Sequence, residues 1–211
     1  MRPKSANEPL TEQTMNIAIL GRGIVGETLG SRWVGVGHSV VYGSRSPGAA
    51  DELFHAEAVQ RADVVVIALP WAAMEPDFLA DLELGERLVI DCTNPIAADF
   101  SDLVPVEAGS GAERVAQAAP HAKVVKAFNT IGVNIMANPA FGTSKATLLI
   151  AGDDAAAKAT VATLAEELGF QPEDAGPLSM SRYLEAQAWI WISMAMKFGY
   201  GREIAFNLQR R

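Results

Sequence analysis

The chain contains few of the residues that build disulfides and metal sites. Among its 211 residues Cys92 is the single cysteine, so no internal disulfide can form, and the three histidines are scattered along the sequence. Such a set provides no ligands for a structural zinc. Positive charge is also short, with 17 basic against 25 acidic residues and a formal net charge of −8. With no cluster of Lys and Arg, the sequence predicts a protein of the reducing cytoplasm that binds neither metal nor nucleic acid.

Long hydrophobic runs are missing as well. Residues 1–14 are polar and contain proline, without the apolar core of a signal peptide, and we expect them to form a disordered N-terminal arm. The stretch that most resembles a membrane span, residues 186–196, is too short for a bilayer core of ~30 Å and is bounded by Glu185 and Lys197. We therefore expect no membrane-spanning segment.

The composition that remains is typical of a globular protein, with 49% apolar and 20% charged residues. From residue 16 onward, short apolar runs alternate with longer segments of helical periodicity, and several runs are continuous, as in strands buried on both faces. This pattern predicts an α/β fold, a doubly wound parallel sheet of the Rossmann type, in one domain over residues 15–211. The predicted strands are residues 16–20, 39–42, 63–69, 87–91, 123–128 and 147–150.

Helices are predicted between and after these strands. One covers residues 24–34, and another covers residues 154–168, with Asp153 or Asp154 as its cap. Residues 95–120 are expected to be a loop that ends in a short helix. A long C-terminal helix over residues 179–197 is apolar nearly all round, so it should be covered by its own domain and by either a ligand or a second subunit.

A glycine-rich loop follows the first strand and opens the first helix. It has the spacing G-x-G-x-x-G, which is weak alone but strong in this strand–turn–helix context. The first glycine allows a tight turn, the second lets a pyrophosphate approach the backbone, and the third lets the helix pack on the strand. Free amides at the start of the helix then bind the anion. The sequence therefore predicts a dinucleotide site at Gly21, Arg22, Gly23, Ile24, Val25 and Gly26.

The turn after the second strand predicts which dinucleotide binds. An acidic residue that binds the ribose of NAD is expected about 20 residues after the glycine loop. Here Gly43 is followed by Ser44, Arg45 and Ser46, and no carboxylate appears before Asp51. The two serines offer hydroxyl groups, and Arg45 offers a planar cation suited to a phosphate. The predicted cofactor is therefore NADP.

Further cofactor contacts are predicted where the later strands end, because ligands of this architecture bind at the carboxyl ends of the strands. Asn129 and Thr130 can hold a carboxamide or a ring edge, although Asn129 can equally cap the helix that follows. Cys92 is expected to be a small residue beside the cofactor and not a nucleophile. The predicted contact residues in these segments are Leu69, Pro70, Trp71, Asn94, Pro95, Ala127, Asn129 and Thr130.

Together these motifs resemble a known family, the NADPH-dependent reductases of the deazaflavin coenzyme F420. The same domain type occurs in the ferric-reductase domains of certain membrane oxidoreductases. The resemblance is carried by the glycine loop, the Gly43-Ser44-Arg45 turn, Leu69-Pro70-Trp71, the string at residues 124–131, and the string at residues 174–179 with Ser181-Arg182. It implies a homodimer with the deazaflavin stacked on the nicotinamide.

Two positions depart from the archaeal deazaflavin enzymes. Those enzymes tend to have Leu-His-Thr where this chain has Phe128-Asn129-Thr130, a form more similar to the ferric-reductase branch, and Arg22 stands where the family often has Thr. The expected function is hydride transfer between NADPH and coenzyme F420 or a similar acceptor such as FMN or FAD. Flavin or ferric reduction is one alternative, and a non-enzymatic NADPH-sensing module is another. Hydride transfer between two such cofactors needs little proton chemistry from the protein, so no catalytic acid or base is predicted.

Overall fold

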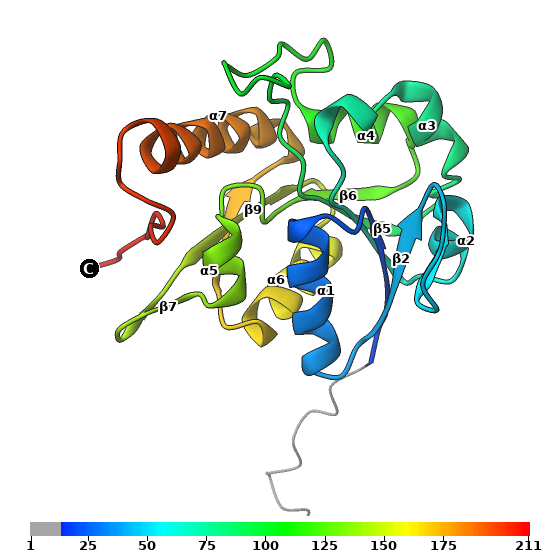
Figure 1. The fold of residues 1–211 in the computed structure, drawn as a ribbon, viewed down its shortest axis with the longest axis horizontal. Helices are drawn as coiled ribbons and strands as arrows, with labels where there is room; N and C mark the ends of the chain where they lie inside the picture. The colour runs from blue at the N-terminus through cyan, green and yellow to red at the C-terminus, as the bar shows by residue number, and fades with distance from the viewer. Residues whose placement is uncertain (1–13) are drawn as a thin grey trace, which may run out of the picture.

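The computed structural model describes residues 14–211 (Figure 1), so the arm expected at residues 1–14 lies almost entirely outside the described residues. Its centre is an eight-stranded sheet in the order β10-β9-β6-β5-β4-β1-β2-β3. Every neighbouring pair is parallel except β6 and β9, which are antiparallel. The strands are β1 (Asn16–Leu20), β2 (Ser39–Ser44), β3 (Glu52–Phe54), β4 (Val64–Ile67), β5 (Leu88–Asp91), β6 (Lys123–Lys126), β9 (Thr147–Gly152) and β10 (Gln171–Gly176).

Helices cover both faces of this sheet because its central strands are apolar on both sides. In β1, Ile17 and Ile19 belong to one hydrophobic cluster, while Ala18 and Leu20 belong to the other. The first cluster is covered by α1 (Ile24–Gly35), α5 (Val133–Ala137) and α6 (Ala155–Glu167). The second is covered by α2 (His55–Gln60), α3 (Pro76–Asp81) and α4 (Gly111–Ala118). The expected doubly wound, mostly parallel fold is thus confirmed.

Two strands of the sheet were not predicted, and both lie at its edges. β3 has three residues, and β10 begins Gln171-Pro172, which is typical of a loop. Proline lacks the N–H that a central strand needs, but β10 pairs with β9 alone, so one side of it stays unpaired. One strand departs from the predicted parallel arrangement, since β9 enters antiparallel to β6 after a small hairpin of β7 (Ala140–Phe141) and β8 (Ser144–Lys145).

The ends of the predicted helices follow their capping residues. Asp154 caps α6 by accepting a hydrogen bond from the N–H of Ala157 at 2.7 Å, while Asp153 accepts instead from Leu178. The short helix expected at the end of the 95–120 loop is α4. Ser110 caps it by accepting a hydrogen bond from the N–H of Glu113, and the Ser110 hydroxyl in turn donates to the Glu113 carboxylate.

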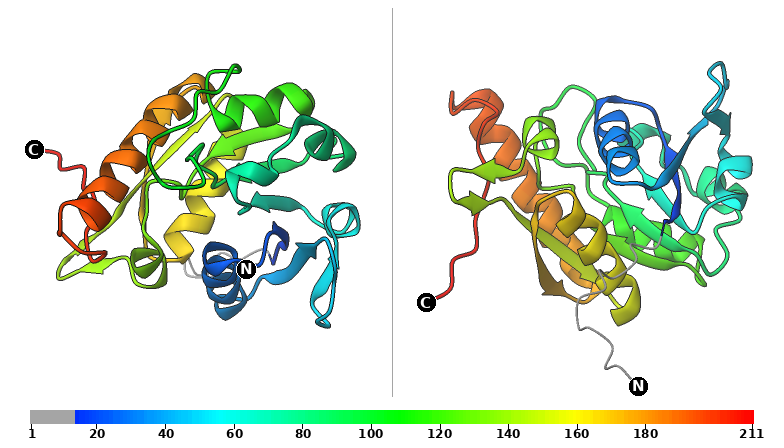
Figure 2. Two further views of the ribbon diagram at one scale, coloured as in Figure 1. Left: turned by 45° about the horizontal axis from the view of Figure 1, so that its top comes forward. Right: turned by 90° about the horizontal axis from the view of Figure 1, so that it is seen from below.

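The C-terminal helix α7 covers Ser181–Ile192 and continues as a single π-helical turn over Ser193–Lys197. Trp191 fixes it to the domain, since its ring contacts Gly132 so closely that a Cβ at Gly132 would lie 2.3 Å from it. Figure 2 shows α7 along one side of the molecule, with the chain beyond it ending at the C-terminus. Within residues 14–211, no helix combines the length and the apolar character that crossing a bilayer requires.

Candidate functional site

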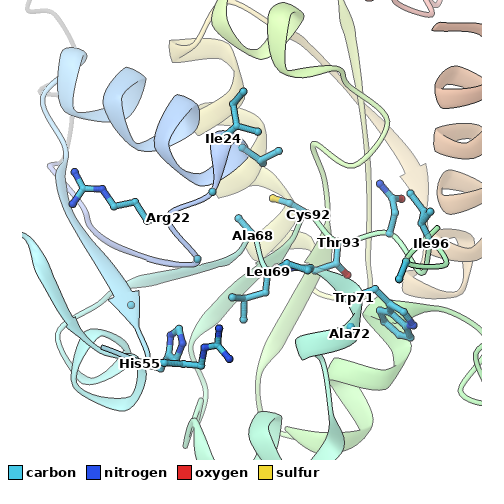
Figure 3. Close-up of a pocket in the computed structure, with 18 of the residues that line it drawn as sticks. Arg22, Ile24, His55, Ala68, Leu69, Trp71, Ala72, Cys92, Thr93 and Ile96 are labelled. Carbon is cyan, nitrogen blue, oxygen red and sulfur yellow. The ribbon is translucent and has the colours of Figure 1, made fainter. Parts of the chain in front are cut away.

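A cleft of about 1020 Å³ opens where the carboxyl ends of β1, β2, β4 and β5 meet (Figure 3). This is the edge at which ligands bind in parallel α/β sheets. Eleven of the residues predicted to contact the cofactor line the cleft, namely Gly21, Arg22, Gly23, Ile24, Val25, Ser44, Arg45, Leu69, Pro70, Trp71 and Asn94. The fold therefore brings together in one hollow residues that are separated by up to 73 positions.

The three glycines of the loop are required for different reasons. Gly21 has φ +101° and lies so close to the Ala68 carbonyl that a Cβ would come within 2.7 Å of it. Gly26 packs α1 onto the loop, because a Cβ there would lie 2.1 Å from the Gly21 carbonyl oxygen. Gly23 is different, since its φ is an ordinary −74° and a Cβ would meet nothing within 4 Å. No described part of the chain requires glycine at this position, so the open space above it suits a ligand that approaches the backbone.

The two arginines at the polar end of the cleft differ in their partners. The Arg22 guanidinium donates to Asp51 at 2.8 Å and to Glu52 at 3.3 Å, and it lies over the ring of Tyr42. The hydrogen bond to Asp51 is the main reason that the pKa of Arg22 is raised. Arg45 has no ion pair with any residue between 14 and 211. Arg22 thus pairs with the acidic residues nearest the turn, and within residues 14–211 the Arg45 cation stays available to an anion.

The other end of the cleft is apolar. After β4 the wall is formed by Ala68, Leu69 and Trp71, and after β5 the chain supplies Cys92, then Ile96 and Phe100 from the following loop. Burial raises the pKa of the Cys92 thiol, so the thiol is protonated at neutral pH and is a poor nucleophile. An aromatic ring system fits this end, while the polar end suits a phosphate.

Six predicted contact residues do not line the cleft, namely Gly26, Ser46, Pro95, Ala127, Asn129 and Thr130. Asn129 is buried and is hydrogen-bonded to Asn94, which lines the cleft. The side-chain amide of Asn94 donates to the backbone carbonyl oxygen of Asn129 at 2.9 Å, and the side-chain amide of Asn129 donates to Oδ1 of Asn94 at 3.0 Å. This pair joins the chain just beyond β5 to the chain just beyond β6. Contacts with a cofactor stay predictions for these six residues and for the eleven that line the cleft.

His55 is a residue of the cleft that the sequence did not identify. It is the first residue of α2 and lines the cleft at the same end as Arg45. The other two histidines lie elsewhere, since His38 is bonded to Glu167 and to the N–H of Met15, and His121 is exposed at the start of β6. No spacing or neighbouring motif singles out His55, so only the packing of α2 beside β2 could reveal its position.

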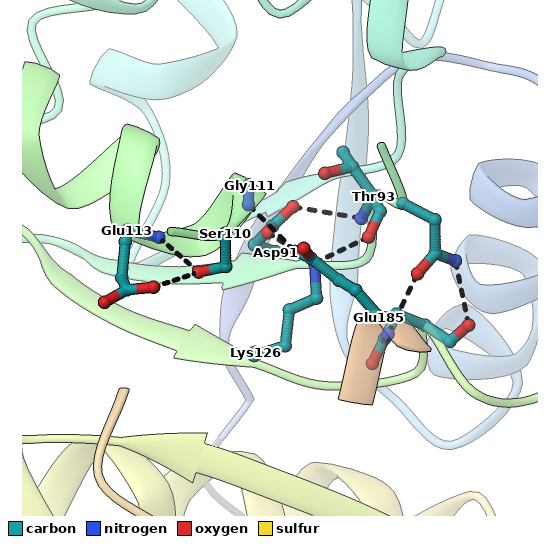
Figure 4. A network of polar contacts seen from close by, with 9 residues as sticks. Asp91, Thr93, Ser110, Gly111, Glu113, Lys126 and Glu185 are labelled. Carbon is teal, nitrogen blue, oxygen red and sulfur yellow. Dashed lines mark hydrogen bonds and ion pairs between the residues drawn. The ribbon is translucent and has the colours of Figure 1, made fainter. Parts of the chain in front are cut away.

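Behind the apolar wall lies a network of buried charges (Figure 4). The ammonium group of Lys126 is fully buried and donates to Asp91 at 2.9 Å, to Glu185 at 2.8 Å and to the carbonyl oxygen of Thr93 at 2.6 Å. Asp91 in turn accepts from the N–H of Thr93, and Glu185 accepts from the N–H of Gly111. One cation therefore ties together β5, β6, α4 and α7.

The charges of this network depend on one another. Burial alone would lower the pKa of Lys126, but the two carboxylates outweigh it and raise the pKa, so Lys126 stays charged. Burial raises the pKa of Glu185. No role was predicted for Lys126, although its place inside the apolar run Val124-Val125-Lys126-Ala127-Phe128 indicates a buried charge with a partner, because lysine is rarely buried without one.

The network also positions the cleft wall. Both backbone polar groups of Thr93 are bound by it, and Thr93 lies in the wall between Cys92 and Asn94. A Cβ at Gly111 would contact Glu185 at 3.1 Å, the Trp71 ring at 3.1 Å and the Thr93 hydroxyl at 3.3 Å, so these three groups converge on one point. The buried charges thus hold the apolar end of the cleft in place.

Comparison with protein families confirms the resemblance inferred from the motifs. Residues 16–95 match the family model described as "NADP oxidoreductase coenzyme F420-dependent". This range contains the glycine loop, the Arg45 turn and the Trp71 segment, which are the parts that form most of the cleft.

Individual proteins support the same relationship. Metalloreductase STEAP3 of Rattus norvegicus is 34% identical over 83% of this chain, and this chain spans 36% of its length. The F420-dependent NADP reductase of Methanocaldococcus jannaschii is 28% identical over 87% of this chain and 94% of its own. A solved structure described as an F420-dependent NADP reductase from Arthrobacter sp. FB24 aligns with a TM-score of 0.80 and 28% identity, over 93% of this chain and 100% of the other.

Replacing Lys126 tests whether the buried network stabilises the fold. We expect Lys126→Met to lower the free energy of unfolding by about 3–5 kcal/mol, because Asp91 and Glu185 lose their shared cation. Lys123→Met is the matched control on the same strand, since its ion pair with Asp154 spans 3.8 Å at the surface and the substitution should cost less than about 0.5 kcal/mol. Urea unfolding followed by circular dichroism measures both, and equal losses would contradict an anchoring role for Lys126.

Proposed function

Because this chain is a relative of the coenzyme F420-dependent NADP oxidoreductases, we propose that it binds NADPH in the cleft and transfers a hydride between NADPH and a deazaflavin of the F420 type. The relationship supports NADP(H) as the nucleotide. Hydride transfer between NADPH and a deazaflavin is the more specific part of the proposal. It rests on the form of the cleft and on the relatives that match over most of their length.

The observation that carries the proposal is the pair of arginines at the polar end. Asp51 and Glu52 both form ion pairs with Arg22, while Arg45, which lines the cleft, has no ion pair within residues 14–211. A guanidinium binds a phosphate through paired, charge-assisted hydrogen bonds. This arrangement favours the 2′-phosphate of NADP and offers no carboxylate to the 2′-hydroxyl of NAD.

The rest of the cleft fits the remainder of the nucleotide. The open space above Gly23 and the first amides of α1, which Gly23 precedes without a side-chain cap, suit the pyrophosphate. From there the cleft continues to the apolar wall of Leu69, Trp71 and Cys92, which suits a nicotinamide ring. The cleft is therefore polar where the phosphates bind and apolar where the reacting ring is expected.

A deazaflavin is the acceptor favoured by the relative that this chain covers over most of its length. The M. jannaschii F420-dependent NADP reductase is covered over 94% of its length, whereas the rat metalloreductase is covered over 36%. The fold described for residues 14–211 thus corresponds to nearly the whole of an F420-dependent enzyme. The wide apolar end, with Phe100 half exposed beside it, leaves room for a second flat ring.

In the proposed reaction the chain binds and orients its ligands and shields them from water. Bound NADPH supplies the hydride that the acceptor takes up. Arg45 and the glycine loop hold the adenosine end, and the wall positioned by Lys126 holds the other end, so that the reacting rings can approach to ~3–3.5 Å. The neutral Cys92 thiol and the apolar side chains keep this end dry, and no catalytic acid or base is assigned.

A second candidate is reduction of a free flavin or a ferric complex. It is favoured by the sequence identities, because the rat metalloreductase shares 34% identity with this chain and the archaeal reductase shares 28%. The Phe128-Asn129-Thr130 sequence points the same way. Measurement of the acceptor separates the two candidates.

We further propose that the protein is a homodimer of the cytoplasm and that α7 forms its interface. The face of this helix that packs on the domain contains Leu184, Ala188 and Trp191, but Ile190 is 53% exposed and Met196 beyond the helix is 54% exposed. Exposed apolar side chains on a packed helix are typical of a subunit interface.

We expect multi-angle light scattering to give twice the mass of the chain, and a stable monomer would contradict the dimer.

Replacing Arg45 tests the choice of nucleotide. We expect Arg45→Ala to weaken NADPH binding by about 10-fold to 150-fold, because a charge-assisted bond of ~1.5–3 kcal/mol is lost. NADH binding should hardly change. Arg61→Ala, which removes an exposed arginine at the end of α2, is the control. Fluorescence titration gives both affinities, and an equal loss for NADPH and NADH would show that Arg45 does not bind the 2′-phosphate.

The identity of the acceptor is tested by offering each candidate acceptor in a separate assay. The protein is mixed under anaerobic conditions with NADPH and with the deazaflavin, FMN or a ferric chelate, and the loss of NADPH is followed at its absorbance band. We expect the deazaflavin to be reduced fastest. Turnover of FMN or iron without turnover of the deazaflavin would support the second candidate, and binding of NADPH without any turnover would indicate a sensing module.

A further inference from the structure

His55 lies in the cleft wall beside the arginine that we assign to the 2′-phosphate. It begins α2, immediately after the edge strand β3, and its ring packs edge-on against Phe78 of α3 with the ring centroids 5.3 Å apart. Figure 3 shows its ring at the edge of the cleft. The residue is half-buried, so part of the ring is held by the protein and part can meet a ligand.

The two ring nitrogens of His55 have different surroundings. Nδ1 is buried and has no hydrogen-bond partner among residues 14–211, and it faces Gly43 so closely that a Cβ there would lie 2.7 Å from it. A proton on Nδ1 would therefore be a buried donor without an acceptor, which is costly. The single proton of the neutral ring is consequently favoured on Nε2, which is not among the buried unpaired atoms. The ring thus offers the cleft an N–H donor.

The charges around His55 keep the ring neutral. Burial lowers the pKa of His55, and the positive charge of Arg45 lowers it further. The other arginine of the cleft, Arg22, is paired with Asp51 and Glu52. Within residues 14–211, the polar end of the cleft therefore presents one cation without an ion pair, Arg45, together with one neutral donor, His55.

We propose that His55 is a second specificity residue of this cleft, and that its Nε2–H donates to the same adenosine 2′-phosphate that Arg45 binds. The inference rests on the proposed use of NADPH. A hydrogen bond to a phosphate anion is charge-assisted, whereas the 2′-hydroxyl of NAD accepts only an ordinary one. His55 therefore adds to the preference for NADP without adding a second positive charge, and Gly43 makes room for its ring.

The test uses two fragments that differ only in the 2′-phosphate, 2′,5′-ADP and 5′-ADP, and measures their affinities by isothermal titration calorimetry at about pH 8, where the ring is neutral. His55→Phe keeps the aromatic contact with Phe78 but removes the donor. His55→Gln restores a neutral N–H near the place of Nε2. His121→Gln is the control at an exposed histidine outside the cleft lining.

We expect His55→Phe to weaken 2′,5′-ADP about tenfold or more and 5′-ADP by less than about twofold, because one charge-assisted bond is lost. His55→Gln should stay within about threefold of the wild type for both fragments, and His121→Gln should change neither. Retained binding of 5′-ADP shows that the variant is folded around the cleft.

A His55→Phe variant that keeps the full preference for 2′,5′-ADP would overturn the inference, and the Arg45→Ala variant separates this result from failure of the proposed function. If Arg45→Ala loses the preference while His55→Phe keeps it, the cleft uses NADP without His55. If the wild-type protein shows no preference for 2′,5′-ADP, both proposals fail. A readout that needs no stable variant is the ¹⁵N signal of His55 Nε2, which should shift with 2′,5′-ADP and not with 5′-ADP, and its failure to do so would also overturn the inference.

Discussion

The structure depends on a single positive charge that has no contact with water. Lys126 lies on a central strand with its ammonium group between Asp91 of β5 and Glu185 of α7, and it also binds the backbone of Thr93. A buried ammonium without these oxygens would be too costly to keep charged. Since these oxygens come from the end of β5 and from α7, satisfying the lysine of β6 requires the two strands and the C-terminal helix to be assembled together.

That requirement also shapes the cleft. Two of the groups that bind Lys126, from Asp91 and Thr93, lie where β5 ends and the cleft begins, so the network holds the wall around Thr93 and Trp71 in place. At the opposite end of the cleft, the distribution of charge leaves a cation available to a ligand. Arg22 is bound by Asp51 and Glu52, and Arg45 keeps its charge for a ligand. The apolar end of the cleft is thus held by Lys126, whose charge is fully paired, and the polar end contains Arg45, which has no ion pair within residues 14–211.

Much of this architecture could be predicted from the sequence because its signals are local. The glycine spacing after β1, the continuous apolar runs of β4 and β6, and the cap at Asp154 each depend on a few neighbouring residues. Edge strands have weaker signals, and β10 was missed because Gln171-Pro172 suits a strand that is paired on one side only. The antiparallel entry of β9 follows from the path of the chain through the β7–β8 hairpin, which no pattern within β9 reveals.

The sequence by itself determined the fold class, the glycine loop and the absence of a carboxylate beside Arg45, because each of these is a property of residues close together in the chain. Only the tertiary structure decided what the remaining charges do. It paired Arg22 with residues 29 and 30 positions away, joined Lys126 to a carboxylate 59 positions away, and placed His55 beside Arg45. The physical reason is that the energy of a charged or hydrogen-bonding group depends on its burial and on its neighbours in space, and neither is written in the order of the residues.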